Sequence, residues 1–244
     1  AIDFVQKPTA LATEKVFAIA DELVAKVTAA ASAPLGALGR LSTSGVAPVR
    51  SRVFANRFDL VVIGTSTGGP QGLKSVIPPL PADFPVPVAI VLHMPIGYTE
   101  GYAKRLDEVS ALTVAEARDG APVRAGIVYL APAGQHLSFR RDSAGHVVAS
   151  LGIRPLHTPH RPSVDVLFQS AADTFGDRVL AVVMTGMGSD GREGAAWVKA
   201  RGGCVLTEAQ DTCVVYGMPR SVVEAGLSDA AVPLTSLADA ILER

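Results

Sequence analysis

The sequence contains little cysteine, no apolar run of membrane-spanning length and no excess of charge of either sign. Cys204 and Cys213 are its two cysteines, too few for a disulfide framework or a four-ligand zinc site. The longest apolar runs, such as 179–184, fall far short of the roughly 20 residues that cross a bilayer. The 22 Lys and Arg residues against 23 Asp and Glu give a formal net charge of -1 and no basic footprint for nucleic acid. We therefore expect a reduced, cytoplasmic chain with no membrane insertion and no nucleic-acid partner.

The composition is that of a folded domain. Hydrophobic residues make up 48% and charged residues 18% of the 244 residues, which argues against general disorder. Residues 1–8 show neither the basic nor the apolar region of a secretion signal. Residues 31–56 are rich in Ala, Gly, Ser and Pro and predict a linker. The sequence thus predicts a strand and a helix within 1–30, a linker at 31–56 and a main domain at 57–244.

The main domain alternates short, continuous apolar runs with stretches of helical periodicity. The runs are 60–63, 86–92, 112–115, 127–130, 180–184 and 204–206. Because continuous Val, Ile and Leu runs are typical of strands buried on both faces, they predict an α/β fold, a doubly wound and mostly parallel sheet flanked by helices. Two alternating segments, 136–141 and 146–150, predict a small antiparallel hairpin.

Candidate functional residues follow the ends of three predicted strands, where the sites of open α/β sheets gather. The first is Ser66, in a GxSxG pattern between a strand and a predicted helix. Such a turn exposes a serine hydroxyl at the edge of the sheet, so Ser66 is a candidate nucleophile, and a Cβ at Gly64 or Gly68 would crowd the turn. The alternative is a glycine-rich loop in which Ser66 or Thr67 caps the helix, or in which backbone amides hold a phosphate.

The second strand end carries His93, directly after the run 86–92. A histidine in this position can accept the proton of a serine in the same sheet, so His93 is a candidate general base. The alternative is a histidine that only forms hydrogen bonds with a neighbouring loop. His136, His157 and His160 are rival candidates, but they fall in predicted hairpin or loop segments.

The third strand end contains a possible dinucleotide-binding motif. The turn 186–191 spells GxGxxG between a strand and a helix, and Glu208 ends the next predicted strand. Asp190 argues against this interpretation, because its carboxylate would compete with a pyrophosphate for the amides of the helix N-terminus. A nucleotide- or dinucleotide-binding domain remains the alternative function.

Asp190 favours a different interpretation of the same turn. If it orients His93 and stabilises the imidazolium formed when Ser66 attacks, the three strand ends form one Ser-His-Asp triad. If it only caps the following helix, it has no catalytic role. An adaptor that binds a partner without turnover is a further alternative.

Six ordered motifs resemble the catalytic domain of the chemotaxis receptor methylesterases, the CheB type of response regulator. They extend from residue 63 to residue 219, and the wider resemblance runs from Asp59 nearly to the end of the chain. The motifs are IGTSTGGP (63–70), HMPIGYT (93–99), LAPAGQH (130–136), HRPSVDVLF (160–168), MTGMGSDG (184–191) and VVYGMP (214–219).

This resemblance implies hydrolysis of γ-glutamyl methyl esters on the cytoplasmic helices of methyl-accepting chemoreceptors, with release of methanol. It also implies deamidation of certain receptor glutamines, and it implies no metal and no organic cofactor. By the same resemblance, Ser66 is the nucleophile, His93 the base and Asp190 the orienting carboxylate. Thr67 and the backbone N–H of Met187 belong to the substrate-positioning site and the oxyanion hole.

The N-terminal segment resembles part of a receiver domain. Residues 2–8 resemble the end of its last strand, where a lysine precedes a proline, and residues 10–30 resemble its closing helix. The strands that carry a phosphoryl-accepting aspartate do not precede them, so the resemblance implies a truncated regulator whose sensor kinase would act through the absent receiver domain. The alternative is a strand and helix unrelated to signalling.

Overall fold

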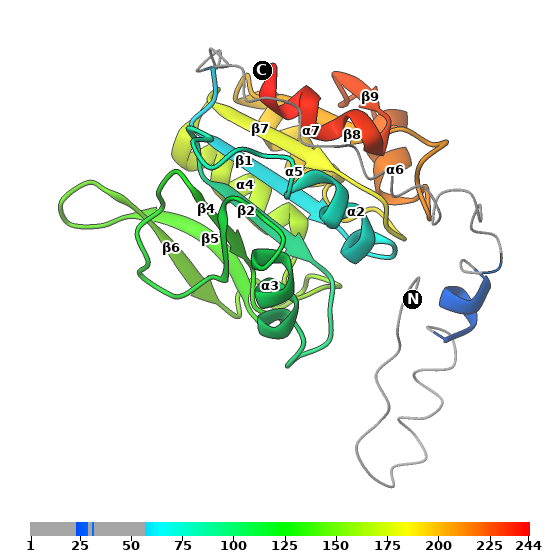
Figure 1. Ribbon diagram of the computed structural model, residues 1–244, viewed down its shortest axis with the longest axis horizontal. Helices are drawn as coiled ribbons and strands as arrows, with labels where there is room; N and C mark the ends of the chain where they lie inside the picture. Colours follow the sequence, from blue (N-terminus) through cyan, green and yellow to red (C-terminus); the bar gives the residue numbers. More distant parts are fainter. Residues whose placement is uncertain (1–22, 29–30, 32–56) are drawn as a thin grey trace, which may run out of the picture.

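The computed structural model describes residues 23–28, 31 and 57–244 (Figure 1). Residues 23–28 are helical and fall within the helix predicted at 10–30. The predicted strand at 2–5, the rest of that helix and the linker beyond residue 31 lie outside the described residues. The division of the chain at 30 and 56 therefore stays a prediction.

The main domain contains a seven-stranded sheet whose paired strands all run parallel, in the order β3-β4-β2-β1-β7-β8-β9. Its strands are β1 (Leu60–Thr65), β2 (Val88–Leu92), β3 (Thr113–Glu116), β4 (Ile127–Leu130), β7 (Val179–Val183), β8 (Cys204–Glu208) and β9 (Ala230–Val232). Strands β5 (His136–Arg141) and β6 (Val147–Gly152) form a separate antiparallel pair. The predicted fold class and hairpin are confirmed. Strand β9 was not predicted, because it has only three residues and does not form a buried apolar run.

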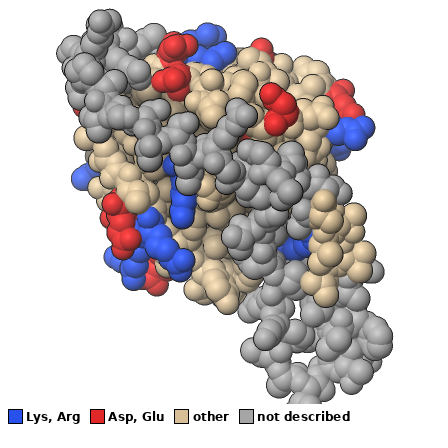
Figure 2. Space-filling view, turned by 45° about the vertical axis from the view of Figure 1, so that its right-hand side comes forward, with Lys and Arg blue, Asp and Glu red and all other residues tan. Residues whose placement is uncertain are grey.

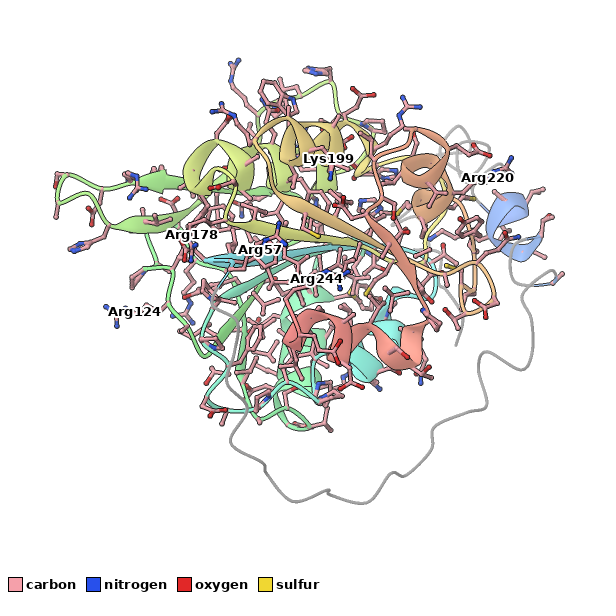
Figure 3. All side chains as sticks on the ribbon, turned by 90° about the horizontal axis from the view of Figure 1, so that it is seen from above. Arg57, Arg124, Arg178, Lys199, Arg220 and Arg244 are labelled. Carbon is pink, nitrogen blue, oxygen red and sulfur yellow. The ribbon has the colours of Figure 1, made fainter. Side chains whose placement is uncertain are left out.

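Helices cover both faces of the sheet, as the view from above shows (Figure 3). They are α2 (Gly69–Val76), α3 (Thr99–Asp107), α4 (Val164–Phe175), α5 (Arg192–Ala200), α6 (Met218–Glu224) and α7 (Leu234–Leu242). Val61 and Ile63 of β1 pack into the core that contains residues of α2, α3 and α7. Leu60 and Val62 pack into the core under α4, α5 and α6. Burial on both faces explains why the strand sequences are continuously apolar.

The surface carries charges of both signs. On the face shown in Figure 2, acidic and basic side chains lie close to one another. At the amino-terminal ends of β1 and β7, Arg178, labelled in Figure 3, donates to both carboxylate oxygens of Asp59 at 2.6 and 2.8 Å. No helix within the described ranges is long and apolar enough to cross a membrane.

The strand order brings the three predicted functional segments together. Strand β1 lies between β2 and β7, and all three run in the same direction. The chain adds β2, β3 and β4 on one side of β1 and then crosses to place β7 on the other side. Such a reversal opens a crevice at the carboxyl ends of the strands. The segments that follow β1, β2 and β7 therefore share one edge of the sheet.

The close packing of α4 against α5 depends on the absence of a side chain at Gly194. A Cβ there would lie 2.6 Å from Cβ of Phe168 and 2.9 Å from Cα of Asp165. We expect Gly194→Ala to lower the free energy of unfolding in urea by about 1–3 kcal/mol. Gly101→Ala in α3 is the matched control, because its Cβ would meet nothing closer than an Arg105 nitrogen at 3.9 Å. Gly101→Ala should raise the free energy of unfolding by up to about 1 kcal/mol, because alanine has the higher helix propensity. Equal changes in the free energy of unfolding for the two substitutions would contradict this packing.

Candidate active site

The turn that follows β1 holds Ser66 against the loop after β7. The backbone N–H of Ser66 donates to the carbonyl of Thr185 at 3.1 Å. Gly68 has a φ of +84°, and a Cβ on Gly64 would overlap the side chain of Val164 at the start of α4. These glycines therefore allow the sharp turn and the close approach of α4. The N-cap of α2 is Gly68, so the alternative in which Ser66 or Thr67 is the N-cap is wrong.

His93 lies at the end of β2, and its imidazole is bonded to Asp190. The distance from Nε2 of His93 to Oδ2 of Asp190 is 2.9 Å, and the two side chains are only 10% and 7% exposed. A carboxylate only accepts, so Nε2 carries the proton and donates it. The other ring nitrogen, Nδ1, is buried and has no hydrogen-bond partner among the described residues. The ring is thus held in the tautomer whose Nδ1 has a free lone pair.

The carboxylate of Asp190 is held by the N-terminus of α4. Its Oδ2 also accepts from the backbone N–H of Val164 at 2.8 Å, and its Oδ1 accepts from the N–H of Asp165 at 3.0 Å and the hydroxyl of Ser163 at 2.9 Å. Burial alone would raise the pKa of Asp190, but the hydrogen bond and charge of His93 and the two amides outweigh it and hold the pKa well below its usual range. The carboxylate is therefore charged and fixed in place. The prediction that Asp190 could cap its own helix is wrong, because it caps α4.

The N-terminus of α5 binds a different carboxylate. The backbone N–H groups of Gly191 and Gly194 donate to Oδ1 of Asp165 at 2.9 and 2.7 Å. Burial raises the pKa of Asp165 to about 6, and the nearby charge of Asp190 adds to this effect. The group that competes with a pyrophosphate at this helix is thus Asp165, and the expectation that Asp190 would do so was wrong.

Glu208 also argues against the dinucleotide interpretation. Its side chain is fully buried, and its Oε2 accepts from the backbone N–H of Thr185 at 2.8 Å. Burial raises its pKa. A carboxyl group that is enclosed behind the turn 186–191 is not positioned to bind a ribose. The motif therefore reflects tight packing of the turn, where a Cβ on Gly186 would lie 2.9 Å from Cβ of Ser66.

A cavity of about 520 Å³ lies at this edge of the sheet. Ser66, Thr67, His93 and Met187 line it, and Asp190 lies behind the ring of His93. Other lining residues are Lys26, Met94, Pro95, Pro159, His160, Arg161, Pro162 and Gly188. Four of the five predicted site residues thus share one cavity, and the fifth is bonded to one of them. Among the described residues, no group of three His, Cys, Asp or Glu side chains is placed to hold a metal ion.

The rival histidines occupy different positions. His136 is buried, accepts from the N–H of Ser163 at Nδ1 and lies 3.2 Å from the carbonyl of Pro155 at Nε2, and burial lowers its pKa. It supports the segment before α4 and does not line the cavity. His157 is exposed. The ring of His160 stacks on that of His93, with centroids 4.1 Å apart and an interplanar angle of 22°.

Sequence reasoning did not identify the residues that hold this site together. Thr185 donates from Oγ1 to the carbonyl of Thr67 at 3.0 Å and accepts from the N–H of Val215 at 3.0 Å, joining three loops. Ser163 is the N-cap of α4, and Asp165 lies in the first turn of this helix. Their only signal in the sequence is that they fall in the motif 160–168, which carries the family resemblance.

Comparison with known proteins agrees with the resemblance seen in the sequence. The model of the CheB methylesterase family matches residues 61–241. The chain belongs to this family. Among its relatives, "protein-glutamate methylesterase/protein-glutamine glutaminase 5" of Myxococcus xanthus is 49% identical over 97% of this chain and 68% of the relative. The corresponding protein of Symbiobacterium thermophilum is 45% identical over 99% of this chain and 69% of its own.

A solved structure supports the same conclusion for the fold. The CheB methylesterase catalytic domain of Thermotoga maritima is 44% identical and matches with a TM-score of 0.74. The match covers 76% of this chain and 97% of that domain. The main domain therefore has the fold of the CheB methylesterase catalytic domain.

The four hydrogen bonds to Asp190 make a specific prediction for Asp190→Asn. Each oxygen of Asp190 accepts from two donors, so the NH₂ group of an asparagine would face two donors in either orientation. The imidazole of His93 would then lose its charged partner, and turnover should fall by about three to four orders of magnitude. The free energy of unfolding should also fall, by about 1–3 kcal/mol. Asp165→Asn is the matched control, because both of its helix bonds go to one oxygen that asparagine retains. Near-normal turnover in Asp190→Asn would contradict this account.

The raised pKa of Asp165 predicts a pH-dependent term in stability. Its carboxyl has a pKa of about 6 in the folded protein, against an ordinary value of 3.8. The folded state therefore holds the proton more tightly, and the stabilising effect of that proton is lost as the pH rises from about 4 to about 6. Across this window, wild type should lose stability relative to Asp165→Asn in urea unfolding. Asp190, whose pKa is lowered, changes the stability only below this window, and His136 contributes to the stability of both proteins. A difference in unfolding free energy between the two proteins that stays constant across the window would therefore overturn the assignment.

Proposed function

We propose that this chain hydrolyses γ-glutamyl methyl esters on methyl-accepting chemoreceptors, releases methanol and also deamidates certain receptor glutamines. One observation carries the proposal: the imidazole of His93 is held at Nε2 by Asp190 in a cavity that it shares with Ser66. The names of the relatives, which combine glutamate methylesterase with glutaminase, support the choice of substrate. Ser66, His93 and Asp190 form the catalytic triad in this proposal.

The first half of the reaction forms an acyl-enzyme. The Ser66 oxygen attacks the ester carbonyl, and Nδ1 of His93 takes the hydroxyl proton while Nε2–H stays bonded to Asp190. The oxyanion receives hydrogen bonds from the backbone N–H groups of Thr67 and Met187. His93 then returns its proton to the leaving oxygen. The bond between the carbonyl carbon and the methoxy oxygen breaks, and methanol departs.

The second half frees the glutamate. His93 removes a proton from a water molecule that attacks the acyl carbon, and Ser66 leaves with the proton that His93 returns. With a glutamine substrate, the same sequence releases ammonia in place of methanol, which explains how one site serves both activities. The charged Asp190 stabilises the imidazolium in both halves.

We further propose that residues 57–244 form the catalytic unit and that residues 1–30 correspond to the end of a receiver domain, through which a sensor kinase acts. The match of the family model to residues 61–241 supports the first part of this proposal. The proposed partners are the cytoplasmic helices of chemoreceptors, and the proposed location is the cytoplasm.

Ser66→Ala should abolish methanol release from methylated receptor membranes. The loss should reach several orders of magnitude, because the nucleophile itself is removed. Ser143→Ala, in the exposed hairpin turn, is the matched control and should keep full activity. Methanol release by folded Ser66→Ala would rule out the nucleophile. Receptor binding by wild type without any methanol release would instead indicate an adaptor.

A fragment that begins at residue 57 tests the proposed boundary. Both core clusters of the described residues lie within it, so it should melt within a few degrees of the full chain and release methanol. Lys26 lines the cavity, so KM is also measured for a full-length Lys26→Ala chain, which tests that contact separately from the boundary. An unfolded or aggregated fragment would show that the boundary is wrong.

A further inference from the structure

The cavity contains a second imidazole whose place the triad does not explain. The rings of His93 and His160 are nearly parallel, with centroids 4.1 Å apart and an interplanar angle of 22°. His160 is exposed, whereas the side chain of His93 is only 10% exposed. His160 therefore covers one face of the His93 ring at the wall of the cavity.

A single hydrogen bond does not fix the plane of an imidazole. The bond from Nε2 to Asp190 holds one atom of His93, and the ring can still tilt about that contact. A tilt displaces Nδ1, the nitrogen that must point at the hydroxyl of Ser66. Aromatic stacking limits this tilt, because it favours a parallel arrangement at a defined separation.

The segment that carries His160 is itself firmly placed. The carbonyl of Arg161 accepts from the backbone N–H of Gly134 at 3.0 Å. Two residues further on, the hydroxyl of Ser163 donates to Asp190 at 2.9 Å. One short segment thus supplies both the ring that covers His93 and a donor that holds its carboxylate partner, so the two constraints act on His93 together.

We infer that His160 is a positioning residue of the proposed esterase: it stacks on His93, keeps Nδ1 aimed at Ser66 and offers an aromatic face to the imidazolium formed during attack. This inference rests on the proposed function. A cation over an aromatic face is attracted electrostatically, so the stack favours the protonated state of His93 that the reaction creates. The aromatic ring, and not a proton on His160, carries this role.

The test compares three substitutions of His160. His160→Phe keeps an aromatic ring, His160→Leu keeps apolar bulk, and His160→Gln keeps hydrogen-bonding capacity. Two rates are measured for each: methanol release, resolved into kcat and KM, and covalent inactivation by phenylmethanesulfonyl fluoride, a small reagent that reacts with activated serine hydroxyls. His157→Leu, in the same exposed segment, is the matched control, and thermal melting checks that every variant is folded.

We expect His160→Phe to keep both rates within about twofold of wild type. His160→Leu and His160→Gln should lose about five- to tenfold in kcat and in the inactivation rate, with KM nearly unchanged, as the loss of one aromatic contact implies. The His157→Leu control should match wild type.

Three results would overturn the inference. If His160→Phe is as slow as His160→Leu, the aromatic ring is not what matters. If His160→Gln keeps full activity, hydrogen bonding carries the role, and if only KM changes, His160 acts on substrate binding. A Ser66→Ala protein that still reacts with the reagent at the wild-type rate would instead refute the proposed function, so the two failures are distinguishable.

Discussion

The carboxylate of Asp190 is the contact on which the rest of this site depends. Removing a charged carboxylate from water costs several kcal/mol unless donors replace the lost hydration. Asp190 receives four donors: one imidazole N–H, one hydroxyl and two backbone amides at the start of α4. His93 and the two amides together hold the pKa of Asp190 well below its usual range, so the carboxylate stays charged in spite of its burial. The N-terminus of α4 thus fixes the carboxylate in place, and the carboxylate and the imidazole hold each other.

The N-termini of α4 and α5 each bind a carboxylate from the neighbourhood of the other helix. Asp190, just before α5, binds the N-terminus of α4, and Asp165, in the first turn of α4, binds the N-terminus of α5. Each partial positive charge at a helix start is met by a carboxylate from the other helix. This arrangement requires the helices to lie very close, which Gly194 allows. Fold stability and site geometry are therefore coupled at this point, since the same bonds serve both.

Much of the fold could be predicted from the sequence, because its signals are local. The runs that became β1, β2, β4 and β7 are continuously apolar, and burial on both faces demands that pattern. Ser66, His93 and Asp190 could be proposed because each lies in the segment that follows such a run, and their catalytic roles stay predictions. The end of β1 was placed two residues early, since Gly64 and Thr65 look like turn residues although both are buried in the strand.

What the sequence did not reveal depends on contacts between distant residues. Asp165 and Asp190 are 25 residues apart, and each binds the N-terminus of the helix that lies next to the other in the sequence. The GxGxxG pattern therefore suggested a phosphate site at backbone amides that already bind Asp165. His160 looked like a rival to His93, and only the tertiary structure shows the two rings stacked. Local pattern places residues at strand ends, but it does not show which carboxylate reaches which helix.

The tautomer of His93 tests the central claim most directly. In a proton–nitrogen correlation spectrum of protein with ¹⁵N-labelled histidine at neutral pH, the account predicts that His93 carries its proton on Nε2, in a bond to Asp190, and leaves Nδ1 bare to receive the proton of Ser66. A protonated Nδ1 with a bare Nε2 would contradict it, because that ring could neither donate to Asp190 nor act as the base toward Ser66.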